Sequence, residues 1–150
     1  MTKKILILKN DRGGDLFTST KLISSLISSN SNTTIYLSEL NHGFSFLFKK
    51  THIKKTNFNL NLLNKLNIFI HILLSNYDKI YILTPKNFYF FLPIIFTKIK
   101  FYAIVYDNYN KNSIELFDDT VVRIKVHKLE FNWKEPYHKD NIGTLEEIKN

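Results

Sequence analysis

Cysteine is absent from this 150-residue chain. Its absence excludes a disulfide framework, a thiolate nucleophile and a cysteine-based zinc site. Arginine is almost absent: the chain has only Arg12 and Arg123, although arginine is the preferred residue for bidentate recognition of phosphates and bases. Because the motifs of nucleic-acid-binding domains are missing as well, we expect no specific nucleic-acid partner.

The net charge of +8 is unevenly distributed. Residues 1–60 carry nine basic and three acidic side chains, residues 61–106 carry five and one, and residues 107–150 carry seven and nine. The basic excess of the first two segments would suit phosphates of a ligand or a membrane surface. Abundant lysine, asparagine and isoleucine also accompany an A- and T-rich genome, so basicity alone identifies no partner.

Apolar runs are too short for a spanning helix, which needs about 20 apolar residues. The run Ile5-Leu6-Ile7-Leu8 ends at charged Lys9, and the stretch 88–96 contains Pro93. We therefore predict a cytoplasmic protein, with peripheral contact at the inner face of the cytoplasmic membrane left open. The aromatic run 88–91 is expected to be core plus an interdomain face, with membrane docking as the alternative.

Short β-branched runs alternate with segments of helical period, which predicts an α/β fold: a Rossmann-like, doubly wound, mainly parallel sheet in one domain over residues 1–150. In the longest helical segment, Leu63, Leu66, Ile70 and Leu74 keep helical register. Strands are predicted at 5–8, 33–37, 53–58, 79–83 and 101–105, with helices at 15–29, 43–50, 60–74 and 85–97. Toward the C-terminus we expect a loop at 107–119, an edge strand at 120–126 and a final helix at 138–148.

The turn after the first strand is the richest candidate site. In a doubly wound sheet, ligands lie beyond the carboxyl ends of the strands, where helix N-termini carry partial positive charge. Gly13 and Gly14 would let the backbone turn tightly and approach a ligand. Asp15 follows as either a helix cap or a general base. The turn has neither the spacing of a dinucleotide fingerprint nor that of a P-loop, so a standard NAD or ATP site is not supported.

Three segments resemble the heptosyltransferases, family 9 glycosyltransferases of the GT-B fold. These segments are Lys4 to Thr20 with its Arg12-Gly13-Gly14-Asp15, Asn76 to Leu83, and His138 to Glu146. The resemblance implies the N-terminal, acceptor-side domain of an inverting glycosyltransferase. Such an enzyme would transfer a sugar from a nucleotide-sugar donor to a lipopolysaccharide or other cell-surface glycan. It works without a cofactor or metal.

By this resemblance Asp15 is the catalytic base. The substrate-binding residues are Asn10, Asp11, Arg12, Gly13, Gly14 and Thr18. Gly13 replaces an aliphatic residue of the family pattern, and Lys21 replaces a proline. The donor-binding C-terminal domain has no counterpart in these 150 residues, so we expect a truncated or split half that is nearly inactive alone, with a separate donor-domain chain as a partner. The alternative is a non-catalytic Rossmann-like module that binds a phosphosugar or a nucleotide.

The other residues that could bind a metal or catalyse a reaction are weaker candidates. The five histidines form neither an HxH nor an HxxxH pair, and His71, inside the longest helical segment, is predicted to be a packing residue. Asp118-Asp119 lies in the predicted loop and is expected to be solvated surface, since Mg²⁺ sites need carboxylates on rigid elements.

Overall fold

The computed structural model describes residues 3–30, 32–104, 121–125 and 146–147. Within them, seven strands form a single sheet in the order β3-β2-β1-β4-β5-β6-β7. Six strands run parallel, and β7 is antiparallel to β6. The strands are β1 (Lys4–Lys9), β2 (Asn32–Ser38), β3 (His52–Thr56), β4 (Lys79–Ile82), β5 (Lys100–Ile104), β6 (Val121–Lys125) and β7 (Glu146–Glu147).

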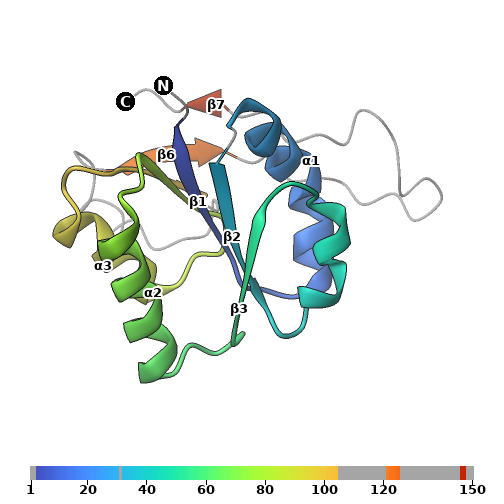
Figure 1. Ribbon diagram of the computed structural model, residues 1–150, viewed down its shortest axis with the longest axis horizontal. Helices are drawn as coiled ribbons and strands as arrows, with labels where there is room; N and C mark the ends of the chain where they lie inside the picture. Colours follow the sequence, from blue (N-terminus) through green and yellow to red (C-terminus); the bar gives the residue numbers. More distant parts are fainter. Residues whose placement is uncertain (1–2, 31, 105–120, 126–145, 148–150) are drawn as a thin grey trace.

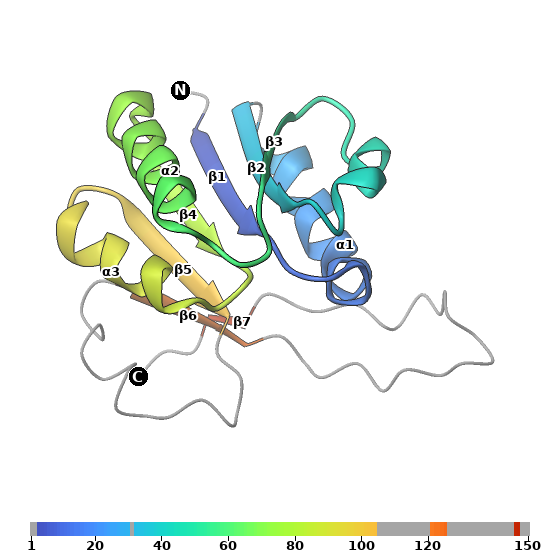
Figure 2. The ribbon, with the colours of Figure 1, turned by 90° about the horizontal axis from the view of Figure 1, so that it is seen from below.

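Helices cover both faces of this sheet, as Figures 1 and 2 show. On one face lie α1 (Gly13–Ser29) and the 3₁₀ helix η1 (His42–Leu47). On the other face α2 (Leu62–Ser75) and α3 (Asn87–Ile95) lie side by side. The predicted α/β, doubly wound fold is therefore confirmed.

β1 lies inside the sheet, between β2 and β4, and this position explains its continuous apolar run. Leu6 lies opposite Thr34 on β2 and Ile80 on β4. Ile5 and Ile7 point into the core beneath α1, whereas Leu6 and Leu8 point into the core beneath α2 and α3. All four side chains are fully buried, as expected of a parallel strand covered on both faces.

The side of α2 that packs against the sheet is not the side that carries most of its leucines. Its buried residues are Ile68 and Ile72. Leu63, Leu66, Ile70 and Leu74 keep helical register but are all exposed. Apolar residues lie on both the buried and the exposed side of this helix, so its period predicts the helix and leaves the packing side open.

Two predictions for the C-terminal part are wrong. The strand β6 is not an edge strand, because it pairs with β5 on one side and with β7 on the other. The prediction of a helix at 138–148 is wrong for Glu146–Glu147, which form the strand β7. The rest of that range and the predicted loop 107–119 lie outside the described residues.

Candidate functional site

Buried polar side chains gather where β1 to β4 end. Of the ten buried polar or charged residues in the described part of the chain, seven lie at these carboxyl ends. The chain continues from β1 into β2 on one side and returns to β4 on the other, so the strand order reverses between β1 and β4. A ligand of a doubly wound sheet binds at such a switch point. The seven residues are Lys9, Asn10, Asp11, Ser38, Asn41, Thr56 and Thr84.

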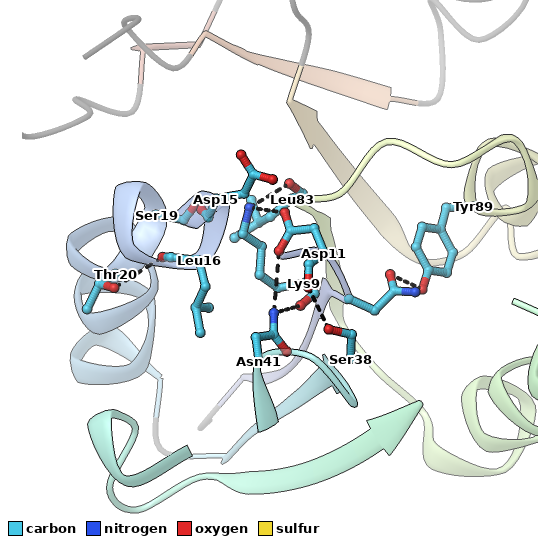
Figure 3. Close-up of polar contacts among 11 residues, drawn as sticks. Lys9, Asp11, Asp15, Leu16, Ser19, Thr20, Ser38, Asn41, Leu83 and Tyr89 are labelled. Atoms are coloured by element: carbon cyan, nitrogen blue, oxygen red, sulfur yellow. Dashed lines mark hydrogen bonds and ion pairs between the residues drawn. The ribbon is translucent and has the colours of Figure 1, made fainter. Parts of the chain in front are cut away.

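A buried ion pair between Lys9 and Asp11 lies at this edge of the sheet (Figure 3). Lys9 Nζ lies 2.6 Å from Asp11 Oδ2 and donates to the Leu83 carbonyl at 3.3 Å. Asn41 Nδ2 donates to the Lys9 carbonyl at 3.1 Å and lies 3.4 Å from Asp11 Oδ1. Burial raises the pKa of Asp11, and the adjacent Lys9 charge opposes that rise. The pair thus places opposite charges at the carboxyl end of β1 with little access to water.

The Asn10 side chain connects the turn after β1 to the end of β3 and to α3. Its Nδ2 donates to the Asn57 carbonyl at 3.1 Å, and its Oδ1 accepts a 2.7 Å hydrogen bond from the Tyr89 hydroxyl. Tyr89 is fully buried on α3, and this burial raises the pKa of its hydroxyl. These contacts use the Asn10 side chain internally, so the turn after β1 is held by β3 and α3.

The helix α1 begins at this turn. Arg12 is the N-cap and makes no side-chain capping hydrogen bond, and the first helical bond runs from Leu16 N to the Arg12 carbonyl at 3.0 Å. The N–H groups of Gly13, Gly14 and Asp15 precede that bond, at the positive end of the helix dipole.

Asp15 is therefore the third residue of α1 and not its N-cap, which corrects the capping interpretation. Its side chain is exposed, and Figure 3 shows its carboxylate pointing away from the Lys9–Asp11 pair. The negative charge of Asp15 still acts on the site, because it contributes to the raised pKa of Asp11. Asp15 thus places an exposed carboxylate beside the switch point.

The two glycines of the turn differ in their surroundings. Neither has a positive φ, so the turn does not draw on the left-handed backbone that favours glycine. A Cβ on Gly13 would lie 3.1 Å from Phe44 Cε2, whereas a Cβ on Gly14 would meet nothing within 4 Å. Gly13 therefore permits close packing of Phe44, and Gly14 leaves open space at the start of α1.

Two cations and one aromatic ring border the site. The Arg12 guanidinium carbon lies 5.6 Å and Lys86 Nζ 4.6 Å from the centre of the Phe58 ring. Lys86 Nζ also donates to the Phe58 carbonyl at 2.6 Å, and the Phe58 N–H donates to Glu39 Oε2 at 2.5 Å. Burial lowers the pKa of Lys86, while Asp11 and Glu39 oppose that change. We call Arg12, Phe58 and Lys86 the cationic rim.

The structure brings the predicted residues 10–15 to one edge of the sheet, but only some of these side chains are exposed to solvent. Asn10 and Asp11 make internal contacts, whereas Arg12 and Asp15 are exposed. Thr18 lies in α1, and its side chain is outside the described part. Sequence reasoning missed Lys9 as the partner of Asp11, and it missed Ser38, Asn41, Tyr89, Phe58 and Lys86. A usable signal was the presence of polar residues directly after several predicted strands.

His71 occupies the packing role predicted for it. Its Nδ1 lies 3.1 Å from the Tyr36 hydroxyl and its Nε2 lies 3.2 Å from the Tyr77 hydroxyl. Burial, together with the positive charges of Lys54 and Lys4, lowers the pKa of His71 to about 4. No group of three or more potential metal ligands occurs in the part of the chain that is described, which does not include Asp118-Asp119. Nor is any helix within that part long and apolar enough to cross a bilayer.

Comparisons with known proteins identify no family. No protein-family model matches the chain, and no curated protein matches it at a significant level. Among solved structures, a ribokinase-like superfamily protein from Enterococcus faecalis is similar over 80% of this chain, with 15% identity and a TM-score of 0.48. The chain spans 44% of that protein's length. The strand order and the helices on both faces of the sheet establish a Rossmann-like α/β fold.

Proposed function

We propose that this chain is the acceptor-side half of an inverting glycosyltransferase that resembles the heptosyltransferases. It would help transfer a sugar from a nucleotide-sugar donor to a lipopolysaccharide or other cell-surface glycan. One observation carries the proposal: the Asp15 carboxylate is exposed in the first turn of α1, directly beyond the carboxyl end of β1 at the switch point. The opening motif, which resembles that of the family, leads to the same residue.

In the proposed reaction, Asp15 accepts the proton of an acceptor hydroxyl while the hydroxyl oxygen attacks the anomeric carbon. The nucleotide diphosphate leaves from the opposite face, so the configuration inverts. Backbone N–H groups at the start of α1 and the charges of Arg12 and Lys86 favour anionic groups nearby. Asp11 stays in its ion pair with Lys9 and takes no proton from the substrate.

A second candidate function is a non-catalytic module that binds a phosphosugar or a nucleotide. The cationic rim and the exposed N-terminus of α1 favour it, because both are suited to holding a phosphate and neither requires a base. The two candidates share the same edge of the sheet and differ in what Asp15 does.

The test supplies the donor-binding half of a heptosyltransferase-type enzyme as a separate chain and measures single-turnover transfer. For Asp15→Asn we expect the chemical step to slow by about 10²–10⁴, the usual contribution of a positioned proton acceptor, with similar acceptor binding. The matched control is Asp78→Asn. Asp78 precedes β4 at the amino end of the sheet, where its carboxylate accepts from the Lys4 N–H at 2.7 Å, and this variant should keep full activity.

Two outcomes would remove the proposal. If Asp15→Asn transfers sugar within a few-fold of the unaltered chain, Asp15 is not the base. If the chain binds a sugar phosphate but supports no transfer with any donor half, the binding module is favoured. The chain alone is expected to turn over far below about 1 per second, because positioning of donor and acceptor contributes about 7–11 kcal/mol that one half cannot supply.

A further inference from the structure

The outer sides of α2 and α3 carry large exposed apolar side chains. We call this surface the α2–α3 face. On α2 the exposed side chains include Leu62, 82% exposed, and Leu74, 76% exposed. The whole surface comprises Leu62, Leu63, Leu66, Ile70, Leu73, Leu74, Phe91, Ile94 and Ile95. Single exposed apolar residues are ordinary, but nine large ones on two adjacent helices mark an interaction surface.

The two helices form one surface because they are packed together. The rings of Phe69 on α2 and Phe96, just after α3, are 5.2 Å apart. A pocket of about 440 Å³ between their C-terminal ends is lined by Leu73 from α2 and Ile95 from α3. Figure 2 shows both helices on the same side of the sheet, away from α1.

The charge on and around this face is almost entirely positive. Neither α2 nor α3 contains an acidic residue, and α2 contains one lysine. Lys98 lines the pocket with Leu73 and Ile95. On the β3 side of α2, Lys54 and Lys55 line a second pocket with Ile70. All three of these lysines are exposed. Asp78 also lines the first pocket, but its carboxylate accepts a hydrogen bond from the Lys4 N–H.

This pattern fits one occupant better than the others. An apolar surface bordered by lysines suits the interface of an anionic bilayer, where hydrocarbon receives the apolar side chains and lipid phosphates receive the ammonium groups. A second copy of the chain fits poorly. In a symmetric pair the same patch meets itself, which would bring lysines together while the two helices offer no carboxylate to pair with them.

We propose that the α2–α3 face docks on the surface of an anionic lipid membrane. Its nine apolar side chains enter the boundary between headgroups and acyl chains, and Lys54, Lys55 and Lys98 contact lipid phosphates. The protein lies on the bilayer and does not cross it. This inference goes beyond the proposed sugar transfer and does not depend on it.

The experiment is co-sedimentation of the 150-residue chain with vesicles of phosphatidylglycerol and phosphatidylcholine in equal amounts, and with vesicles of phosphatidylcholine alone. We expect clear binding to the first and much weaker binding to the second. Each lysine near an anionic surface contributes about fivefold to partitioning, so Lys54→Glu/Lys55→Glu should lower the partition coefficient by about 25-fold or more. The matched control is Lys21→Glu/Lys49→Glu, on α1 and just after η1, which should bind nearly as the unaltered chain does.

The apolar arm uses Leu62→Gln/Leu66→Gln/Leu73→Gln, which replaces exposed side chains and leaves the buried side of α2 unchanged. We expect at least a tenfold loss of partitioning, on the order of what losing partly inserted apolar area costs. Its control is Leu40→Gln/Phe46→Gln, two exposed apolar residues away from this face. Circular dichroism of each variant checks that the fold is kept.

Three results would overturn the proposal. The first is no binding to the anionic vesicles. The second is equal loss of binding in the control variants, which would indicate a nonspecific effect of charge or hydrophobicity. The third is a concentration-dependent dimer in sedimentation velocity that the triple leucine variant abolishes while vesicle binding persists; that result would assign the face to a second copy. Failure of sugar transfer would leave vesicle binding unaffected, so the two proposals fail independently.

Discussion

Replacing Lys9 by methionine tests whether the ion pair at the end of β1 holds the site together. Methionine keeps most of the apolar stem of lysine and removes the ammonium, so little cavity is created. Asp11 then loses the group 2.6 Å from its Oδ2, and the Leu83 carbonyl loses its 3.3 Å donor. The carboxylate keeps a long contact of 3.4 Å from Asn41 Nδ2, and Thr84 still lowers its pKa.

The size of the effect follows from the burial of both partners. Removing one member of a buried ion pair leaves an uncompensated charge and costs about 3–5 kcal/mol. We expect Lys9→Met to lower the free energy of unfolding by this amount at neutral pH. Asp11→Asn should cost a similar amount, because it leaves the buried Lys9 ammonium with only a neutral amide oxygen as its partner.

The pH dependence gives a second measure with a definite sign. Burial already raises the pKa of Asp11, and losing Lys9 would raise it further. In the variant the folded state then binds a proton more readily than the unfolded state, so stability rises as the pH falls. The cost of Lys9→Met should therefore be smaller at pH 5 than at pH 7.

Urea unfolding of both single variants and of the double variant, at both pH values, provides the assay. Because the two side chains touch, the costs should not add, and the double variant should recover about 1–3 kcal/mol of their sum. Two results would refute the reasoning. One is a cost below about 1 kcal/mol for Lys9→Met at pH 7, and the other is simple additivity of the two single costs.

Three further predictions follow from other contacts. Tyr89→Phe removes the 2.7 Å donor to Asn10 Oδ1 and should cost about 1–3 kcal/mol of stability, because the acceptor stays buried; urea unfolding measures it. Gly14→Ala should raise the free energy of unfolding by about 0.4–1 kcal/mol, because the new Cβ meets nothing within 4 Å and the unfolded chain loses freedom; thermal unfolding checks the direction. For His71, whose pKa is about 4 against an ordinary value of 6.5, stability should fall as pH drops from 6.5 to 4, since the unfolded state binds the proton more readily; NMR titration of its imidazole should give the low pKa.

Much of the fold could be predicted because elements such as β1 and α2 carry strong local patterns. The run Ile5 to Leu8 is apolar on consecutive positions, which requires burial on both faces and therefore a central parallel strand. The segment that became α2 shows helical period clearly. The side of α2 that packs on the sheet could not be predicted. Apolar residues of α2 lie on both its buried and its exposed side, and no local pattern distinguishes Ile68 and Ile72 from the exposed leucines.

The candidate site was predictable in place and not in detail. A polar turn after the first strand, with glycines and Asp15, indicates where the switch point lies. The contacts within it join residues that are far apart in the chain: Tyr89 reaches Asn10 across 79 positions, and Lys9 reaches Leu83 across 74. Such pairs depend on how helices and strands pack, which the local sequence does not encode.

The burial of the Lys9–Asp11 ion pair limits which substitutions could raise the thermal stability of this chain. Replacing a buried ion pair by two well-packed apolar side chains is often neutral or stabilising by 1–4 kcal/mol, although removing only one partner is costly. A library of variants selected for heat resistance alone should therefore reach Lys9 and Asp11 together, and seldom singly. A lineage that keeps both residues while other positions vary would indicate that the edge of the sheet is retained for something other than thermal stability.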